Sequence, residues 1–233
     1  MSDTYGNGQP IFNGIKTVGN IELLGSQSIT STANGNISIT PNGTGDVLIN
    51  THSTLEWDTI AIGQGAPGSA PPADEHLVQA TNGVAYCRAF DGTTPEDLIF
   101  NWPVPKDCDV SAGIKYLVQG VATSATPPAS GEGCCYELSG YCSNPAAGGG
   151  LNGTYGTAVA SKNTDLYAAG TATQNDWFET ALSSTVTITD VIAGGQTQLY
   201  FRRNTADSAD DYGQDLETAY LHIQWTKKTV KVT

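Results

Sequence analysis

The densest group of side chains that could do chemistry is acidic and lies near the C-terminus. Its members are Asp207, Asp210, Asp211, Asp215 and Glu217. Carboxylate oxygens are ligands for hard cations, so the four aspartates are candidate Ca²⁺ ligands. Their spacing differs from an EF-hand loop, which places acidic residues at positions one, three and five and glycine at six. The alternative interpretation is a solvated acidic loop between two strands, with no bound ion.

Two consecutive arginines, Arg202 and Arg203, precede this acidic segment. Neighbouring side chains of a strand face opposite ways, so one arginine is expected to pair with the acidic loop that follows. A surface ion pair of this kind contributes only ~0–1 kcal/mol to stability, so we expect it to matter little for folding.

Aromatic side chains in the C-terminal half could stack on sugar rings. The candidates for glycan contact are Tyr141, Tyr155, Trp177 and Tyr212, with Tyr167 as a further loop aromatic. Most aromatic residues of a β-sandwich belong to its core, so core packing is the competing interpretation for each of them.

Signatures of catalysis are missing from the sequence. It contains no G-x-S-x-G, H-E-x-x-H or Walker A motif, and its three histidines are scattered. Residues 63–68 match G-x-G-x-x-G, but Pro67, Pro71 and Pro72 forbid the helix that a dinucleotide site requires. Glycosidases need only two carboxylates, which the 23 acidic residues could supply. The preferred interpretation is a protein that is not an enzyme and carries no cofactor, with Ca²⁺ as the one candidate ion.

The five cysteines fit no metal motif. The count is odd, no Cys-x-x-Cys pair occurs, and the N-terminus lacks a secretory signal, so free buried thiols are expected. A disulfide involving Cys142 remains an alternative for a particle that matures outside the cell.

Charge and composition narrow the class of partner and fold. With 23 acidic and 10 basic residues, the net charge is −13, which disfavours nucleic acid and anionic membranes. No apolar run is long enough for a transmembrane helix, so no membrane insertion is expected. Only 14% of residues are charged and Gly is frequent, while helix-favouring residues are scarce. These features predict an all-β protein.

The N-terminal part carries an arm and a repeat. We expect an arm over residues 1–20 and a β-repeat stalk over 21–50, where short alternating units are separated by Gly/Asn turns. Such units are too short to form a core alone and become stable when stacked, within one chain or across several. Two ordinary hairpins at a sandwich edge are the alternative. The apolar residues assigned to oligomerisation or particle docking are Ile11, Phe12, Ile15, Ile21, Ile37, Ile39, Val47 and Ile49.

The sequence pattern changes near residue 105, where longer runs of alternating apolar and polar residues begin. Residues 51–105 read as a Gly/Pro-rich linker and a small β region, residues 106–226 as a β-sandwich, and 227–233 as a basic tail. About eight strands separated by turn signals are typical of a jelly-roll-like sandwich. The expected strands are residues 114–122, 134–141, 155–159, 164–168, 176–182, 185–188, 197–202 and 218–225.

Two stretches resemble structural proteins of tailed bacteriophages. The segment ANGNISITPNGTGDVLIN resembles their N-G-x-I-x-I-x-P-N-G-T-G-x-V-x-I repeats. The segment from Leu199 to Trp225 resembles the closing strands of a β-sandwich common in phage virion proteins. The pattern L-x-R-x-x-x-D-x-x-D-D-Y-x-x-D is assigned there to Leu199, Arg202, Asp207, Asp210, Asp211, Tyr212 and Asp215.

This resemblance implies a virion structural protein, usually a homotrimer, that is made in the host cytoplasm and projects from the head or tail. The stalk is short for a tail fibre, which favours a capsid decoration (cement) or short head-fibre protein that contacts the major capsid protein or another virion protein. A tail-associated fibre or spike that binds a host surface glycan is the alternative. A third hypothesis is a non-viral lectin-like module or a small glycan-cleaving enzyme.

Overall fold

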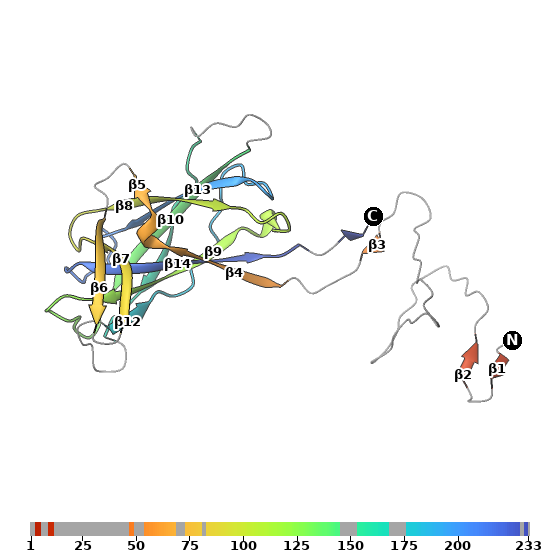
Figure 1. Cartoon of the computed structure of the whole chain (residues 1–233), viewed down its shortest axis with the longest axis horizontal. Helices are drawn as coiled ribbons and strands as arrows, with labels where there is room; N and C mark the ends of the chain where they lie inside the picture. Colours follow the sequence, from red (N-terminus) through yellow and green to blue (C-terminus); the bar gives the residue numbers. More distant parts are fainter. Residues whose placement is uncertain are drawn as a thin grey trace. The chain divides into compact units, whose positions relative to one another are not determined.

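The computed structural model describes residues 3–5, 9–11, 47–48, 54–68, 73–80, 83–144, 153–167, 176–228 and 231–232 (Figure 1). The chain divides into two compact units, one formed by residues 1–48 with 231–233 and the other by residues 49–230. No helix among the described residues is long and apolar enough to cross a membrane.

The smaller unit contains two short antiparallel pairs. Strand β1 (Asp3–Tyr5) pairs with β2 (Gln9–Ile11), and β3 (Val47–Leu48) pairs with β15 (Lys231–Val232). Of the residues assigned to docking, Ile11 is in β2 and Val47 is in β3. The other six lie outside the described residues: Phe12, Ile15, Ile21, Ile37, Ile39 and Ile49. The stacked repeat therefore stays a prediction.

The larger unit is a sandwich of two antiparallel sheets, as predicted. The six-stranded sheet has the order β12-β9-β14-β7-β6, with β4 also paired to β14. Its strands are β12 (Asp176–Glu179), β9 (Ile114–Ala122), β14 (Leu216–Thr226), β7 (Gly83–Phe90), β6 (Asp74–Ala80) and β4 (Leu55–Ala61). Strand β14 pairs with β9 over most of its length, and its other edge pairs first with β7 and then with β4.

The second sheet has the order β11-β10-β13-β8-β5. Its strands are β11 (Val159–Asn163), β10 (Cys134–Ser143), β13 (Gln196–Arg203), β8 (Asp97–Pro103) and β5 (Ala66–Pro67). Two short 3-10 turns complete the described elements, η1 (Ile62–Gln64) and η2 (Val110–Ala112).

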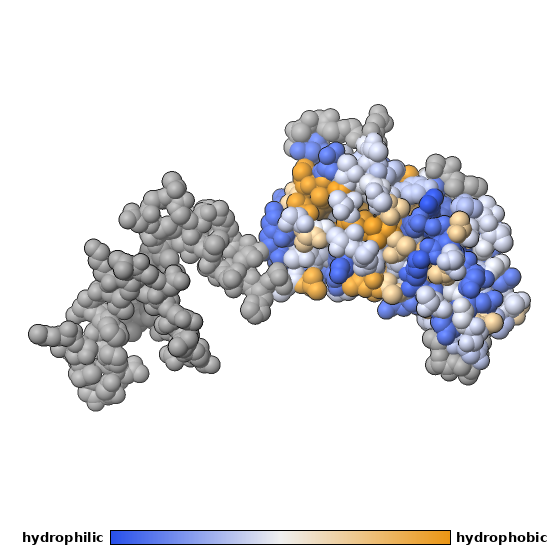
Figure 2. All heavy atoms as spheres, turned by 180° about the vertical axis from the view of Figure 1, so that it is seen from behind, coloured by the Kyte–Doolittle hydropathy of each residue, from blue (hydrophilic) through white to orange (hydrophobic). Residues whose placement is uncertain are grey.

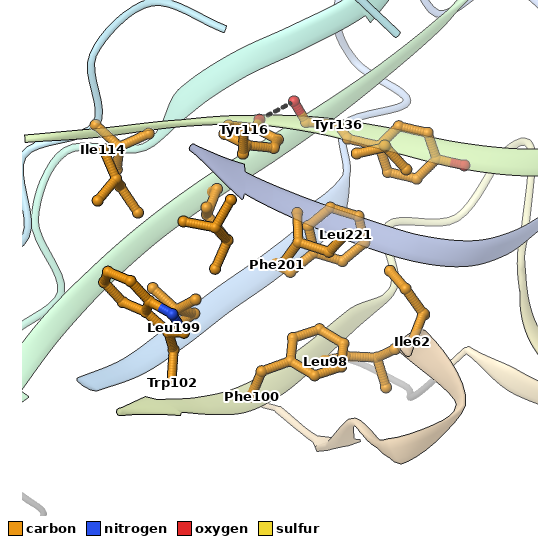
Figure 3. Packing of buried hydrophobic residues seen from close by; sticks show 14 of the residues in the cluster. Ile62, Leu98, Phe100, Trp102, Ile114, Tyr116, Tyr136, Leu199, Phe201 and Leu221 are labelled. Carbon is orange, nitrogen blue, oxygen red and sulfur yellow. Dashed lines mark hydrogen bonds between the residues drawn. The ribbon is translucent and has the colours of Figure 1, made fainter. Parts of the chain in front are cut away.

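The core between the sheets follows from period-two alternation. In β13, every second side chain is buried, with Leu199 and Phe201 completely so. Phe201 stacks on Tyr136 of β10 with 5.3 Å between ring centroids, and Phe90 meets both rings edge-on (Figure 3). The buried Tyr116 hydroxyl donates to the carbonyl of Tyr136 over 2.8 Å, so this polar group is satisfied inside the core.

The sandwich extends beyond the segment expected from the sequence. Strands β4, β6, β7 and β8 all precede residue 105, yet they belong to the same two sheets as the later strands. In place of the strands expected at 155–159 and 164–168, one strand, β11, pairs with the start of β10. Residues 185–188 contribute only an isolated bridge, Ile114 to Val186. Tertiary pairing, rather than local alternation, decides these positions.

All five cysteines are free thiols buried in the sandwich: Cys87, Cys108, Cys134, Cys135 and Cys142. Burial, with a smaller contribution from Glu217, raises the pKa of Cys87 to about 11. Burial raises the pKa of Cys135 to about 12 and that of Cys108 to about 11. Because the thiolate is the reactive form, raised pKa values and burial both disfavour reaction of these thiols in the folded protein.

We predict that the folded chain resists thiol labelling at pH 8. A pKa near 11 leaves roughly one thiol in a thousand ionised at that pH, and burial blocks the reagent as well. Colourimetric titration with a disulfide reagent should detect almost no reaction within minutes, and all five thiols after unfolding in guanidinium. Rapid reaction of one thiol in the native protein would contradict this burial.

Candidate functional site

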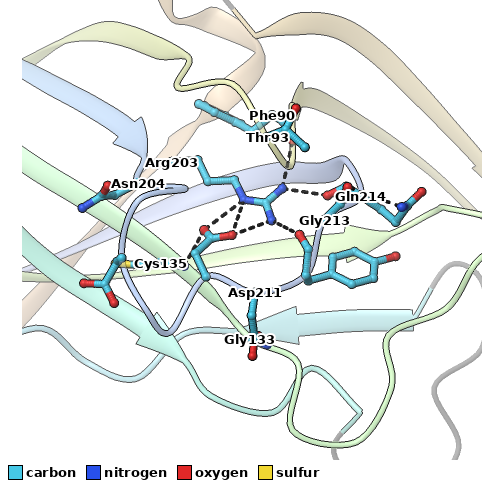
Figure 4. A network of polar contacts seen from close by, with 12 residues as sticks. Phe90, Thr93, Gly133, Cys135, Arg203, Asn204, Asp211, Gly213 and Gln214 are labelled. Atoms are coloured by element: carbon cyan, nitrogen blue, oxygen red, sulfur yellow. Dashed lines mark hydrogen bonds and ion pairs between the residues drawn. The ribbon is translucent and has the colours of Figure 1, made fainter.

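The acidic segment after β13 is organised by one buried ion pair. The side chains of Arg203 and Asp210 are both fully buried. The guanidinium donates through Nε to Oδ2 over 3.0 Å and through Nη2 to Oδ1 over 2.8 Å (Figure 4). Burial, the largest single influence, would lower the pKa of Arg203, but the hydrogen bonds to Asp210 and the attraction of nearby acidic groups together outweigh it, and the pKa lies above its ordinary value. The arginine therefore stays charged inside the protein.

The same guanidinium also binds backbone carbonyls from two separate segments. Nη1 donates to the carbonyl of Phe90 over 3.1 Å and to that of Gln214 over 2.8 Å, while Nη2 reaches the carbonyl of Tyr212 (Figure 4). Arg203 thus ties the end of β7 to the loop that leads into β14.

Three aspartates of this loop accept hydrogen bonds from other groups of the protein. Asp210 accepts from the backbone N–H of Cys135 over 2.9 Å, and Asp211 accepts from that of Gly133 over 2.7 Å. Asp207 accepts from Lys162, and this bond holds the pKa of Asp207 below its ordinary value. Asp215 is exposed. Within the described residues, no three acidic, histidine or cysteine side chains form a group that could hold a metal ion.

This arrangement corrects the expectation of a weak surface pair. The arginine that holds the acidic loop is Arg203, and its partner is buried rather than solvated. Arg202, the arginine that matches the virion pattern, instead pairs with Glu137 of β10. Its Nη2 lies 2.6 Å from Glu137 Oε2, and its side chain is partly exposed. The sequence placed both arginines on one strand, but alternation alone does not say which of them faces inward.

Two of the four residues predicted to contact a glycan are buried, which is a second correction. Tyr141 and Tyr212 are buried, and their hydroxyls donate to Gln198 and to the carbonyl of Thr126. Tyr155 packs between Tyr141 and Tyr200, with ring centroids 5.1 and 5.3 Å away. Tyr141 lies opposite Gln198, on the side of β10 turned away from the core, and Tyr155 covers it there. Of the four, only Trp177 is strongly exposed, at 57%.

Trp177 has an aromatic neighbour that the sequence reading missed. Its ring lies 6.2 Å from that of Tyr220, centroid to centroid, and the two planes differ by only 10°. Tyr220 is 37% exposed and lies 6.1 Å from the imidazole of His222. Alternation in β14 could have identified it, because Leu221, Ile223 and Trp225 face the core and Tyr220 alternates with them.

Beside these rings, a row of hydrogen bonds crosses four neighbouring strands. Glu179 of β12 accepts from the Gln119 amide over 2.7 Å, and Gln119 Oε1 lies 3.0 Å from His222 Nε2. His222 Nδ1 lies 2.9 Å from the hydroxyl of Thr59 in β4. Because Gln119 donates to the carboxylate with its amide nitrogen, its oxygen is the acceptor for His222, which places the imidazole proton on Nε2. Burial lowers the pKa of His222, so the ring is neutral at pH 7.

These residues form a surface that we call the outer face. It consists of Trp177, Tyr220, Glu179, Gln119, His222 and Thr59, all on the side of the six-stranded sheet turned away from the core. Aromatic rings beside fixed donors and acceptors suit binding of a ligand that is partly apolar and partly polar. The imidazole contacts an amide and a hydroxyl rather than a carboxylate, so it lacks the acidic partner of a Ser–His–Asp triad.

Elsewhere the surface is mixed. Figure 2 views the molecule from behind, where hydrophobic residues gather over one half of the sandwich and hydrophilic residues over the other. The hydrophobic half is the end at which β4 begins and β14 ends (Figures 1 and 2). By sequence, Leu55 and Trp57 lie at the beginning of β4, and both are strongly exposed. This apolar end is separate from the pair formed by Trp177 and Tyr220, since Tyr220 pairs with Ala61 at the far end of β4.

No protein-family model and no curated protein matches this sequence. Among solved structures, the chain is similar to a family 11 carbohydrate-binding module from Clostridium thermocellum in complex with a β-1,3-1,4-mixed-linked tetrasaccharide. That match has 10% identity and a TM-score of 0.33, and covers 78% of this chain and 95% of the module. A carbohydrate-binding module specific for non-crystalline cellulose, CBM28, has 11% identity and a TM-score of 0.34, covering 75% and 88%. At such TM-scores these likenesses carry no argument about ligand.

We predict that Arg203→Met lowers the free energy of unfolding by about 3 kcal/mol or more, because it leaves the buried Asp210 carboxylate without a counter-charge. The neighbouring variant Arg202→Met removes a partly exposed pair and should cost less than about 1 kcal/mol. Urea denaturation followed by tryptophan fluorescence measures both changes. Equal losses for the two variants would show that the buried pair does not hold the fold.

Proposed function

We propose that this chain is a non-enzymatic structural protein of a tailed-bacteriophage virion, assembled as a homotrimer. Its N-terminal part seats on the capsid, and the β-sandwich is displayed outward as a decoration or short head-fibre domain. The proposal is supported by the resemblance of the repeat before residue 50 and of the segment from Leu199 to Trp225 to phage structural proteins.

One observation carries the proposal furthest. The residues that match the virion pattern in the closing segment build structure: Asp210 closes on Arg203, and Asp211 and Asp207 hold neighbouring backbone and Lys162. Acidic side chains that hold the sandwich together, rather than a ligand, fit a structural protein. The division of the chain into two compact units also suits separate docking and display parts.

Charge restricts the partners of such a protein. At −13, the chain repels packaged nucleic acid and anionic membranes, which leaves protein surfaces such as the major capsid protein as docking partners. Binding across neighbouring capsid subunits would stabilise the shell, because a ligand of the assembled state favours that state.

A second candidate function is adsorption, in which a tail-associated fibre or spike binds a host glycan. The observation that favours it is the exposed aromatic pair of the outer face, Trp177 and Tyr220.

We expect the purified full chain to be a trimer in solution. Light scattering coupled to size-exclusion chromatography should then give about 73 kDa, three times the 24.3 kDa of one chain. Removing residues 1–50 should abolish the trimer, because the short repeat units need partners to bury their apolar faces. A trimer that survives this deletion would place the subunit contacts in the sandwich.

Immunogold electron microscopy of intact virions tests the location. With an antibody against the sandwich, dense label over the head is the expected result for a decoration protein. Label confined to the tail tip would instead support the adsorption function. Virions without this polypeptide in their protein composition, measured by mass spectrometry, would overturn both virion functions.

A further inference from the structure

We propose that the outer face binds an uncharged glycan, whose pyranose ring packs against the pair formed by Trp177 and Tyr220 while its hydroxyls bond to Gln119 and Glu179, which His222 and Thr59 hold in place. This inference deepens the adsorption function and rests on it for its biological role. It commits to a ligand class and to the residues that hold it.

The aromatic pair supplies the apolar half of the recognition. A pyranose presents ring C–H groups on one face and hydroxyls around its rim, so it fits a flat aromatic surface flanked by polar groups. Trp177 and Tyr220 have near-parallel planes and come from β12 and β14, two strands that flank β9. Both backbones are paired in the sheet, so the rings stand on a rigid support and little entropy is lost when a ligand binds.

The polar row supplies the directional half. Gln119 uses one of its two amide N–H groups on Glu179, and a carboxylate can accept about four hydrogen bonds in total. Their remaining capacity matches sugar hydroxyls, which both donate and accept. Because Thr59, His222, Gln119 and Glu179 brace one another, their positions are fixed before the ligand arrives.

Charge selects among glycans. Glu179 is the acidic member of the row, the imidazole of His222 is neutral at pH 7, and the whole chain carries −13. Lys115 lies on the same strand as Gln119, four residues and thus about 13 Å away. A uronate or sialate at the pair would face Glu179, and strands β12, β14 and β4 contain no lysine or arginine, so an uncharged sugar is favoured.

A second copy of the chain fits the outer face less well. Two chains at −13 repel each other, and a stable protein interface buries ~800 Å² on each side, far beyond one pair of rings. The mixture of rings and hydrogen-bonding groups also differs from the apolar centre of a subunit interface.

Isothermal titration calorimetry of the full chain tests the site. The probes are uncharged oligosaccharides (cellotetraose, maltotetraose, mannotriose and chitotetraose) together with anionic tetragalacturonate. We expect at least one uncharged probe to bind, with an affinity that changes less than twofold between 50 and 500 mM NaCl. Trp177→Ala and Tyr220→Ala should each weaken that binding at least tenfold, whereas Tyr220→Phe should retain it within about threefold.

Tyr86→Ala is the matched control. Tyr86 is 71% exposed on β7 and belongs to the same sheet, so its loss removes an equally large ring away from the proposed site. Circular dichroism melting checks that each variant stays folded. Binding that survives both ring variants would overturn the site while leaving adsorption intact, and tighter binding of tetragalacturonate would overturn the ligand class. No binding by any probe or by host cells would overturn the site and the adsorption function together.

Discussion

The buried guanidinium of Arg203 is the constraint on which the closing part of this sandwich depends. A charge in the interior must be matched by a counter-charge and by acceptors for its remaining N–H groups. Asp210 provides the first, and the carbonyls of Phe90, Tyr212 and Gln214 provide the second. Since Asp210 in turn accepts from the backbone of Cys135, both sheets are linked through one side chain. The loop has few alternative conformations that satisfy all these groups.

The outer face inherits its geometry from this loop. Strand β14 begins at Leu216, directly after the loop closed by Arg203, and a register shift between Thr218 and Tyr220 follows within a few residues. That shift sets which side chains of β14 face away from the core, and it brings Tyr220 opposite Gln119. The bulge near the start of β14 therefore fixes where Tyr220 lies beside Trp177 and the hydrogen-bonded row.

Much of the fold could be predicted from local pattern. Alternation located β9 at Ile114–Ala122 and the cores of β10, β13 and β14, because each is a long half-buried strand. The sequence pattern failed to locate strands that form only by pairing with segments far away in the sequence. Strand β11 is largely polar and exists because it pairs with β10, and β6 to β8 look like a separate region until their partners are known. For the site, the sequence did not show which aromatic side chains are exposed. Tyr141 and Trp177 were both candidates for glycan contact, but only Trp177 is exposed to solvent.

The pairing of β4 with β14 has a mechanical consequence. Leu55 at the start of β4 lies opposite Thr226 at the end of β14, and Lys227 N–H donates to the carbonyl of Thr54 over 3.0 Å. The chain thus enters and leaves the sandwich at the same point. A pulling force applied through these two connections would break the hydrogen bonds between β4 and β14 one after another, rather than all at the same time. Under tension, β4 would peel from Leu55 onward, while β14 stays held by β9 along its other edge.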